Sequence, residues 1–286
     1  MQPRDREAVT DAPATESPYS ILPREGPYPA AIGSALITMV EPHEGHDHAY
    51  NRWYEDDHFY SGAMAMPWMF AGRRFVAPRE LQALRYPDDS AVAQPLSAGK
   101  YISVYWITEG RYEDHLRWTV STNQRLLPDG RIYLERTHVY TSFQTYAGAV
   151  YRDETGPRAL HSLDYPYRGL VLEVVDAPEG GDRDALLDWL RGEFLPGRLP
   201  GTPIAMTLVF LPMPLPPDRM AYVEDTPGLE RRLTLLSFTE APPDECWDLF
   251  AGAGAAIASA GKGRVELAAP FFPTLPGTDV YVDRLR

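Results

Sequence analysis

The order of the predicted strands and helices constrains the fold of this chain most strongly, because the same order occurs twice. Residues 34–152 alternate β-rich runs with amphipathic stretches in the order strand, helix, strand, strand, helix, strand. The predicted elements of this first module are Ala35–Val40, Ala49–Phe59, Gly72–Val76, Lys100–Ile107, Glu113–Leu127 and Ile132–Tyr146. Their order is that of the ferredoxin-like split unit.

Residues 167–286 repeat this order with almost no sequence identity to the first module, so the repeat is one of pattern. The predicted elements here are Gly169–Val175, Asp182–Leu195, Ile204–Leu211, Arg232–Thr239, Asp244–Ala260 and either Val265–Leu267 or Asp279–Val282. Both helices of one unit cover the same face of its sheet, so the other face must be buried against a second sheet. The sequence therefore predicts an α+β fold in which two ferredoxin-like βαββαβ modules form a pseudo-dimeric α+β barrel, with a pocket between the sheets.

Composition limits the partners and the compartment. The formal net charge of −13 and the pI near 5.0 make nucleic acid and anionic membranes poor partners. No run of 18 apolar residues occurs, and the charged N-terminus lacks the apolar segment of a secretory signal. The single cysteine, Cys246, excludes an internal disulfide and is expected to be a small core residue. We expect a cytoplasmic monomer or homodimer whose residues 1–33 form a proline-rich, extended N-terminal arm.

One stretch of the first module carries a family resemblance. Residues 51–58 read Asn-Arg-Trp-Tyr-Glu-Asp-Asp-His after the first strand, and Pro67 and Arg73-Arg74-Phe75 follow them. This order resembles the opening of modules in the dimeric α+β barrel superfamily, which includes EthD-like proteins, small cofactor-free monooxygenases and aromatic polyketide cyclases. The resemblance covers residues 35–76 by motif and the rest only by pattern. The N-terminal arm and a histidine-rich loop depart from typical members.

The first group of candidate catalytic residues lies in this motif. The resemblance implies that His58 faces the barrel interior or its mouth, where it acts as a general base or as a hydrogen-bond partner of the substrate. A histidine suits this role because its ordinary pKa lies near neutrality. Tyr54 shares a helix face with His58, whereas Asp57 projects about 100° away from it. Trp53 is expected to contact the substrate. The alternative is that His58 only packs against the helix end.

The second group lies on the long predicted strand near residue 138. Period-two alternation predicts that one face of this strand carries His138, Tyr140, Ser142, Gln144 and Tyr146. Tyr101, Ser103 and Tyr105 repeat the pattern on the third strand. Such a polar and aromatic face suits a pocket wall that binds an oxygenated aromatic molecule, although a solvated face is the alternative. We expect His138 to be a second possible base, Tyr140 or Tyr54 to donate to the developing oxyanion, and Tyr105, Ser142 and Gln144 to contact substrate.

Three further features are candidates for binding or catalysis. The loop that holds His43, His46 and His48 could bind zinc, iron or manganese, although its spacing is generic and a polar loop is the alternative. Arg73 and Arg74 alternate in direction, so one of them, expected to be Arg73, could face inward and bind a carboxylate or enolate oxygen. Their alternative is a surface salt bridge. Glu173, in an apolar run, is either a buried acid or base or a strand-edge carboxylate.

The resulting functional prediction is a cofactor-independent enzyme of the cyclase, isomerase, lyase or monooxygenase type. The resemblance implies proton abstraction next to a carbonyl of a hydrophobic, oxygenated small molecule held between the sheets. The alternatives are a metal-dependent enzyme that uses the His43–His48 loop and a non-catalytic protein that binds a small ligand. Haem bound through a histidine is a weaker possibility, because no haem-specific motif is visible.

Overall fold

A computed structural model describes residues 26–66, 68–217 and 227–286 of the chain. Most of the predicted N-terminal arm and Pro67 therefore lie outside the described residues. The described residues form eight antiparallel strands in one closed barrel, in the order β1-β3-β2-β8-β5-β7-β6-β4. The strands are β1 (Ile32–Pro42), β2 (Met69–Val76), β3 (Tyr101–Thr108), β4 (Arg136–Tyr151), β5 (Gly169–Asp176), β6 (Ile204–Pro212), β7 (Arg232–Thr239) and β8 (Arg264–Pro273).

The two halves of the barrel have the same internal strand order. The first half, β1 to β4, is arranged β4-β1-β3-β2, and the second half, β5 to β8, is arranged β8-β5-β7-β6. Antiparallel pairing of β2 with β8 and of β4 with β6 joins the halves and closes the barrel. The predicted fold, two ferredoxin-like modules that form one pseudo-dimeric α+β barrel, is confirmed.

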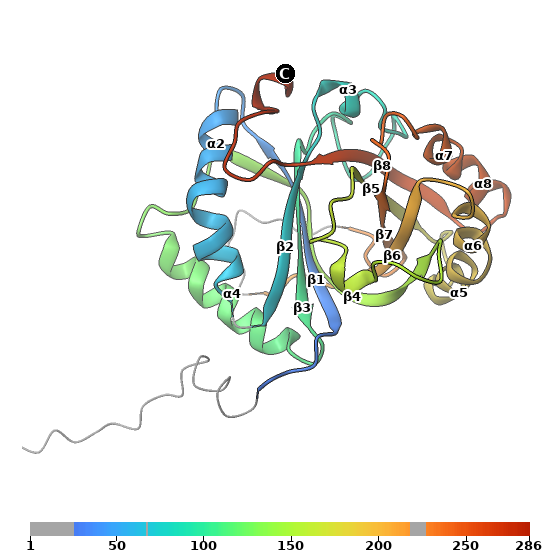
Figure 1. The fold of residues 1–286 in the computed structure, drawn as a ribbon, viewed down its shortest axis with the longest axis horizontal. Coiled ribbons are helices and arrows are strands. Elements are labelled where there is room, and N and C mark those ends of the chain that lie inside the picture. Colours follow the sequence, from blue (N-terminus) through green and yellow to red (C-terminus); the bar gives the residue numbers. More distant parts are fainter. Residues whose placement is uncertain (1–25, 67, 218–226) are drawn as a thin grey trace, which may run out of the picture.

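Helices cover the outside of the barrel on two opposite sides (Figure 1). On the first half lie α2 (Asp47–Trp53), its π-helical continuation η1 (Tyr54–Met64) and α4 (Tyr112–Leu126). The helices of the second half are α5 (Arg183–Trp189), η3 (Leu190–Phe194), α6 (Leu195–Arg198), α7 (Asp248–Ala251) and α8 (Ala253–Ser259). Short turns complete the set: α3 (Arg79–Gln82), η2 (Ala159–His161) and η4 (Val282–Arg284).

Two details of the predicted elements need correction, and the open alternative for the last strand is decided. The helix predicted over residues 244–260 is split into α7 and α8 at Gly252. The last strand is β8, which contains Val265–Leu267, whereas residues 279–282 lead into the turn η4. The helix that follows β1 changes from α to π geometry at Tyr54, a change that hydrophobic periodicity does not report.

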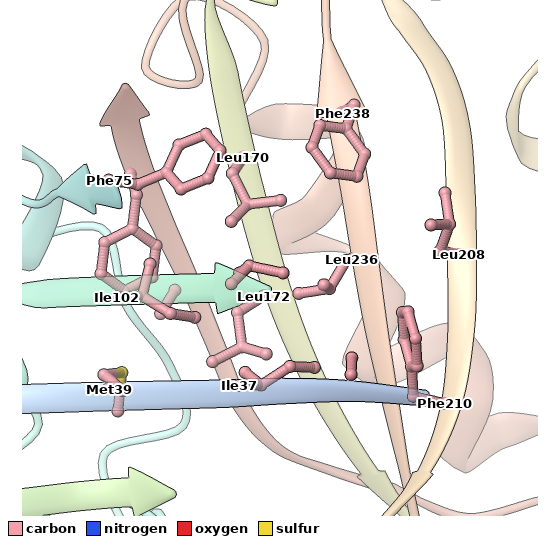
Figure 2. Close-up of a cluster of buried hydrophobic side chains, with 14 of the residues drawn as sticks. Ile37, Met39, Phe75, Ile102, Leu170, Leu172, Leu208, Phe210, Leu236 and Phe238 are labelled. Carbon is pink, nitrogen blue, oxygen red and sulfur yellow. The ribbon is translucent and has the colours of Figure 1, made fainter. Parts of the chain in front are cut away.

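Apolar side chains fill the barrel interior, so the predicted pocket between the sheets is wrong. Figure 2 shows inward-facing residues of both halves packed together across the barrel. The Trp106 ring stacks on Phe210 with a centroid distance of 5.4 Å, which joins β3 to β6 directly. An eight-stranded barrel has an interior just wide enough for side chains to fill, and large residues such as Phe75 and Phe238 fill this one. A ligand site must therefore lie on the outer face of the sheet.

No helix among the described residues is both long enough and apolar enough to span a membrane.

Candidate functional site

A cavity lined by polar and aromatic side chains lies between the outer face of the first half and the helices η1 and α4. It has a volume of about 130 Å³, and we call it the η1 cavity. Leu36, Thr38 and Val40 of β1 form its floor, because alternate residues of that strand, Ile37 and Met39, point into the barrel. Polar side chains on its wall include those of Thr38, Tyr54, His58, Asn123, Arg136 and His138. Leu215 and Pro216, which follow β6 in the second half, also line the cavity.

A β-bulge in β4 decides which of its residues reach the cavity. Tyr140 pairs with Met39, but His138 pairs with Val40, so Val139 is an extra residue in the ladder. His138 therefore lies on the outer face with Thr141 and Phe143, whereas Tyr140 points into the barrel. The predicted face that combined His138 with Tyr140, Ser142 and Gln144 is wrong, because one inserted residue reverses the alternation.

His58 enters the cavity from η1 and is held by aromatic neighbours. Its ring stacks on Trp53 with a centroid distance of 4.3 Å and meets the edge of Tyr54 at 5.2 Å. Burial, followed by the positive charge of Arg136, lowers the pKa of His58 from 6.5 to about 3. Its Nδ1 is buried and has no hydrogen-bond partner among the described residues. The ring is therefore neutral and fixed by stacking.

Gly62, one turn further along η1, leaves the room that the His58 ring occupies. A Cβ at this position would lie 2.4 Å from Nδ1 of His58, well inside van der Waals contact. The sequence gives no separate signal for this relation, because it depends on the wider spacing of the π-helix.

His138 faces the same cavity from the sheet. Its Nδ1 lies 2.8 Å from the hydroxyl of Thr141, and that hydroxyl lies 2.7 Å from Oγ1 of Thr38. Burial, then the positive charge of Arg136 and the electrostatic coupling to the His58 imidazole, lowers the pKa of His138 to about 3. Two neutral imidazoles and one permanently charged guanidinium therefore surround a small cavity.

A second aromatic layer supports the cavity wall beneath Tyr54. The hydroxyls of Tyr54 and Tyr105 are 2.5 Å apart, and burial raises the pKa of Tyr105 well above its ordinary value. The guanidinium of Arg74 lies 4.3 Å from the centre of the Tyr54 ring and forms a buried ion pair with Glu55. Arg74, one of the two alternating arginines, is therefore used to hold η1 against β2.

The structure separates the predicted catalytic residues into two sets. His58, His138 and Tyr54 line the η1 cavity. Asp57 is half-exposed and pairs with Arg131, whose hydrogen bond lowers the pKa of that carboxyl. Tyr140 is inside the barrel, where its hydroxyl lies 2.6 Å from that of Thr234. The predicted roles of Asp57 and Tyr140 at the reacting centre therefore do not fit their positions.

The predicted substrate contacts are divided in the same way. Tyr105 lines the cavity, and Trp53 lies directly behind His58. Gln144 points into the barrel and donates to the Ser142 hydroxyl at 3.0 Å, so neither residue reaches the cavity. Arg73 donates to two backbone carbonyls of residues 163 and 165, and it contacts neither the cavity nor an acid.

The histidine-rich loop does not form a metal centre in the described residues. His43 lies 3.2 Å from Glu135, His46 lies 2.8 Å from the hydroxyl of Tyr133, and His48 lies 2.8 Å from Asp283. The three rings point to different partners, and no group of three or more potential ligands converges in the part of the chain that the structure describes.

In the second half an ion pair and packed apolar side chains fill the region between sheet and helices. Glu173 on β5 is fully buried, and both of its oxygens accept from Nη1 of Arg198, at 3.1 and 2.9 Å. The Arg198 guanidinium lies 4.4 Å from the centre of the Phe250 ring. Glu173 is thus a buried carboxylate, as one of the two alternatives predicted, but it is paired with Arg198 within the core. Among the described residues, the second half therefore has no counterpart of the η1 cavity at this position.

Sequence reasoning missed Arg136, Asn123 and Thr38 as cavity residues. Arg136 was detectable, because it stands two residues before His138 on one strand and must share its face. Asn123 of α4 carries no such signal, because its position depends on how that helix packs against η1.

Comparison with known proteins supports the fold. The sequence matches no family model and no curated protein. Among solved structures, an anthrone oxidase-like protein matches with a TM-score of 0.51 and 11% identity, covering 86% of this chain and 92% of that chain. A DypB variant from Rhodococcus jostii RHA1, in complex with haem, matches with a TM-score of 0.50 and 9% identity, covering 91% and 97%. At such low identity the likeness shows the fold alone.

The match to a haem complex corrects the prediction that the chain uses no cofactor. That prediction came from a fold resemblance, and a second DypB variant of this fold, with a TM-score of 0.50, is also in complex with haem. His58 and His138 offer the neutral imidazole nitrogen that haem iron takes. The η1 cavity is too small for haem. Its volume of about 130 Å³ is comparable with that of a cavity that binds one benzene ring, whereas haem has four pyrrole rings. We derive no step through haem.

Proposed function

We propose that this chain is an enzyme that binds a small oxygenated molecule in the η1 cavity and removes a proton from it. The base is a neutral imidazole, that of His58 or His138. The observation that carries the proposal is the convergence of these two imidazoles and Arg136 on one small cavity whose remaining wall is largely apolar.

The proton leaves a carbon next to a carbonyl, or a phenolic hydroxyl, and goes to a ring nitrogen of the base. The electron pair stays on the substrate, which becomes an enolate or a phenolate. Both imidazoles are weak bases, because burial and Arg136 hold each pKa at about 3. Negative charge that develops on the substrate opposes these effects and raises the basicity of the imidazole during the reaction.

Arg136 and Tyr54 are the groups that can stabilise the product anion. Arg136 supplies a permanent positive charge at the cavity wall, and Tyr54 supplies a hydroxyl that is shared with Tyr105. The enolate or phenolate is an electron-rich species, which is the common entry to oxidation, isomerisation or ring closure. The reaction that follows proton removal depends on the substrate.

The test is exchange of carbon-bound hydrogen for deuterium in small aromatic ketones, followed by NMR in heavy water. We expect wild-type protein to accelerate exchange, and His58→Gln or His138→Gln to reduce the rate by roughly 10²-fold or more. His43→Gln, which changes an exposed histidine of the loop, is the control. Exchange that is unchanged in both cavity variants would contradict the proposal.

A further inference from the structure

Among the described residues, the side chain of Arg136 has neither an acid nor a backbone carbonyl as a partner, unlike the fully buried arginines. Arg85 donates to three backbone carbonyls, and the others form ion pairs. Arg74 pairs with Glu55, Arg198 with Glu173, and Arg232 with Asp176. Acidic residues outnumber lysine and arginine, 40 to 27, so a carboxylate is usually close to an arginine. The half-buried side chain of Arg136 nevertheless forms no hydrogen bond and no ion pair within the described ranges, and its Nε is buried without a partner.

Arg136 is also held in place, so its free hydrogen-bond donors have a fixed direction. Its guanidinium carbon lies 4.6 Å from the centre of the Trp53 ring, which is a cation–π contact. Trp53 is itself fixed, because its indole nitrogen donates to the backbone carbonyl of Arg131 at 2.8 Å. An oriented guanidinium without an acceptor is ready to bind an anion without first breaking another interaction.

The surroundings of Arg136 strengthen this preference for an anion. The two histidines on the cavity wall, His58 and His138, are neutral, and no Asp or Glu among the described residues lines the cavity beside Arg136. The remaining wall is largely apolar, and a charge-assisted hydrogen bond is stronger where water is excluded. Asp57, the nearest acid in sequence to His58, is occupied by Arg131 at the surface.

We propose that Arg136 binds an ionised oxygen of the ligand and that the natural ligand is a single-ring carboxylate or phenolate. The size follows from the cavity volume of about 130 Å³, which is close to that of a cavity that takes one benzene ring. This inference rests on the proposed function, because it names the substrate class of the same site. It adds that one anionic oxygen is already present when the substrate binds, in addition to the carbon or hydroxyl that loses the proton.

Binding of matched ligand pairs to the full chain tests the inference without requiring turnover. The pairs are benzoate with benzamide and 4-nitrophenolate with 4-nitroanisole, measured by calorimetry at a pH where the acids are ionised. Wild-type protein should bind at least one anion roughly tenfold or more tightly than its neutral partner. Arg136→Met should lose this preference while it keeps the affinity for the neutral ligand, and Arg136→Lys should retain part of it. The pair with the larger preference separates carboxylate from phenolate.

Arg131→Met is the matched control, because Arg131 is a nearby surface arginine that pairs with Asp57 outside the cavity. It should bind like wild type. An equal loss in both variants would overturn the inference, since general charge would then explain it. Equal affinities for both members of each pair, or no binding of any probe to wild type, would also overturn it. If only Arg136→Met loses the preference for the anion, the inference is supported even when no deuterium exchange occurs. The binding experiment therefore distinguishes failure of this inference from failure of the proposed function.

Discussion

His58, His138 and Arg136 carry the proposed chemistry, and each is held by a neighbour that sequence pattern does not reveal. Trp53 stacks on His58 and also lies beneath the Arg136 guanidinium, so one indole orients the base and the cation together. Thr141 holds His138 through its Nδ1. This arrangement makes Trp53 a positioning residue behind the cavity wall.

Gly62→Ala tests whether the position of His58 matters, without removing the imidazole. The added Cβ would lie 2.4 Å from Nδ1 of His58, so the ring must turn out of its stacked position. We expect the rate of deuterium exchange to fall by roughly tenfold to 10²-fold, the usual effect of misplacing a catalytic group by about 1 Å.

The matched control for this variant is Gly192→Ala in η3 of the second half. No atom lies within 4 Å of a Cβ added there. This control should exchange like wild type and gain a few tenths to about 1 kcal/mol in stability, because alanine restricts the unfolded chain. Gly62→Ala with a wild-type rate would show that the stacked position of His58 is not needed.

The buried histidines also predict how stability depends on pH. The folded protein holds the pKa of His58 and His138 at about 3 and that of His115 at about 4, whereas the unfolded chain has ordinary values near 6.5. The unfolded state therefore binds more protons below pH 6.5, and the free energy of unfolding should fall as the pH drops from 6.5 towards 4.

Urea unfolding between pH 7.5 and 4.5 measures this dependence above the range in which most carboxylates titrate. The double variant His58→Gln with His138→Gln should show a smaller loss over the same interval, because two of the three groups are gone. An identical loss in wild type and double variant would mean that these imidazoles are protonated in the folded protein.

At the scale of single elements, β4 shows what periodicity predicts and where it stops. The existence, length and β character of this strand follow from its run of Thr, Tyr, Val and Phe. The sequence gives no signal for the extra residue Val139. This residue changes the alternation, so that the residues before it face the opposite side of the sheet from the one predicted relative to the residues after it. The same alternation correctly places Arg136 and His138 on one face of the strand, so the contribution of β4 to the site could be predicted from the sequence.

The helix after β1 gives the same lesson. The Trp-Tyr-x-x-x-His pattern places Tyr54 and His58 at one cavity, as their spacing predicts. The change to π geometry at Tyr54, and with it the role of Gly62, depends on packing against β2 and α4 and has no local signal. Closure of the cavity by Leu215 also depends on a segment distant in sequence.

The Glu173–Arg198 pair, which joins α6 to β5, predicts a stability pattern for the second half. Arg198→Met leaves a buried carboxylate without its partner, so we expect a loss of about 3–5 kcal/mol in the free energy of unfolding. Glu173→Leu combined with Arg198→Met removes both charges and should be closer to wild type. Urea unfolding measures both. A single variant as stable as the double variant would mean that water reaches this pair.

At the scale of the whole molecule, the packed barrel interior provides stability, whereas the proposed site lies outside the barrel. The order of predicted elements identified the barrel, because hydrophobic alternation records which face of a strand is buried. It did not report that the interior is full, because periodicity carries no information on the volume enclosed by eight strands. The site consequently lies between sheet and helices of one half.

Two variants on opposite faces of the sheet test this separation. Phe210→Ala removes a ring stacked on Trp106 inside the barrel and should cost about 3–5 kcal/mol, with ligand affinity unchanged at temperatures where the variant is folded. Ala63→Leu extends a buried cavity residue and should weaken ligand binding with a smaller effect on stability. Thermal unfolding and calorimetry give both quantities. The reverse pattern would place the ligand between the sheets.

The most direct test of the central claim is a ¹⁵N NMR spectrum of histidine-labelled protein, recorded at pH 6 with and without benzoate, which is ionised at that pH. His58→Gln and His138→Gln assign the two cavity resonances among the seven histidines. The account predicts neutral imidazole shifts for both in the free protein and ligand-induced changes concentrated at these two. Protonated shifts in the free protein, or changes confined to His43, His46 and His48, would contradict the assignment of the η1 cavity as the functional site.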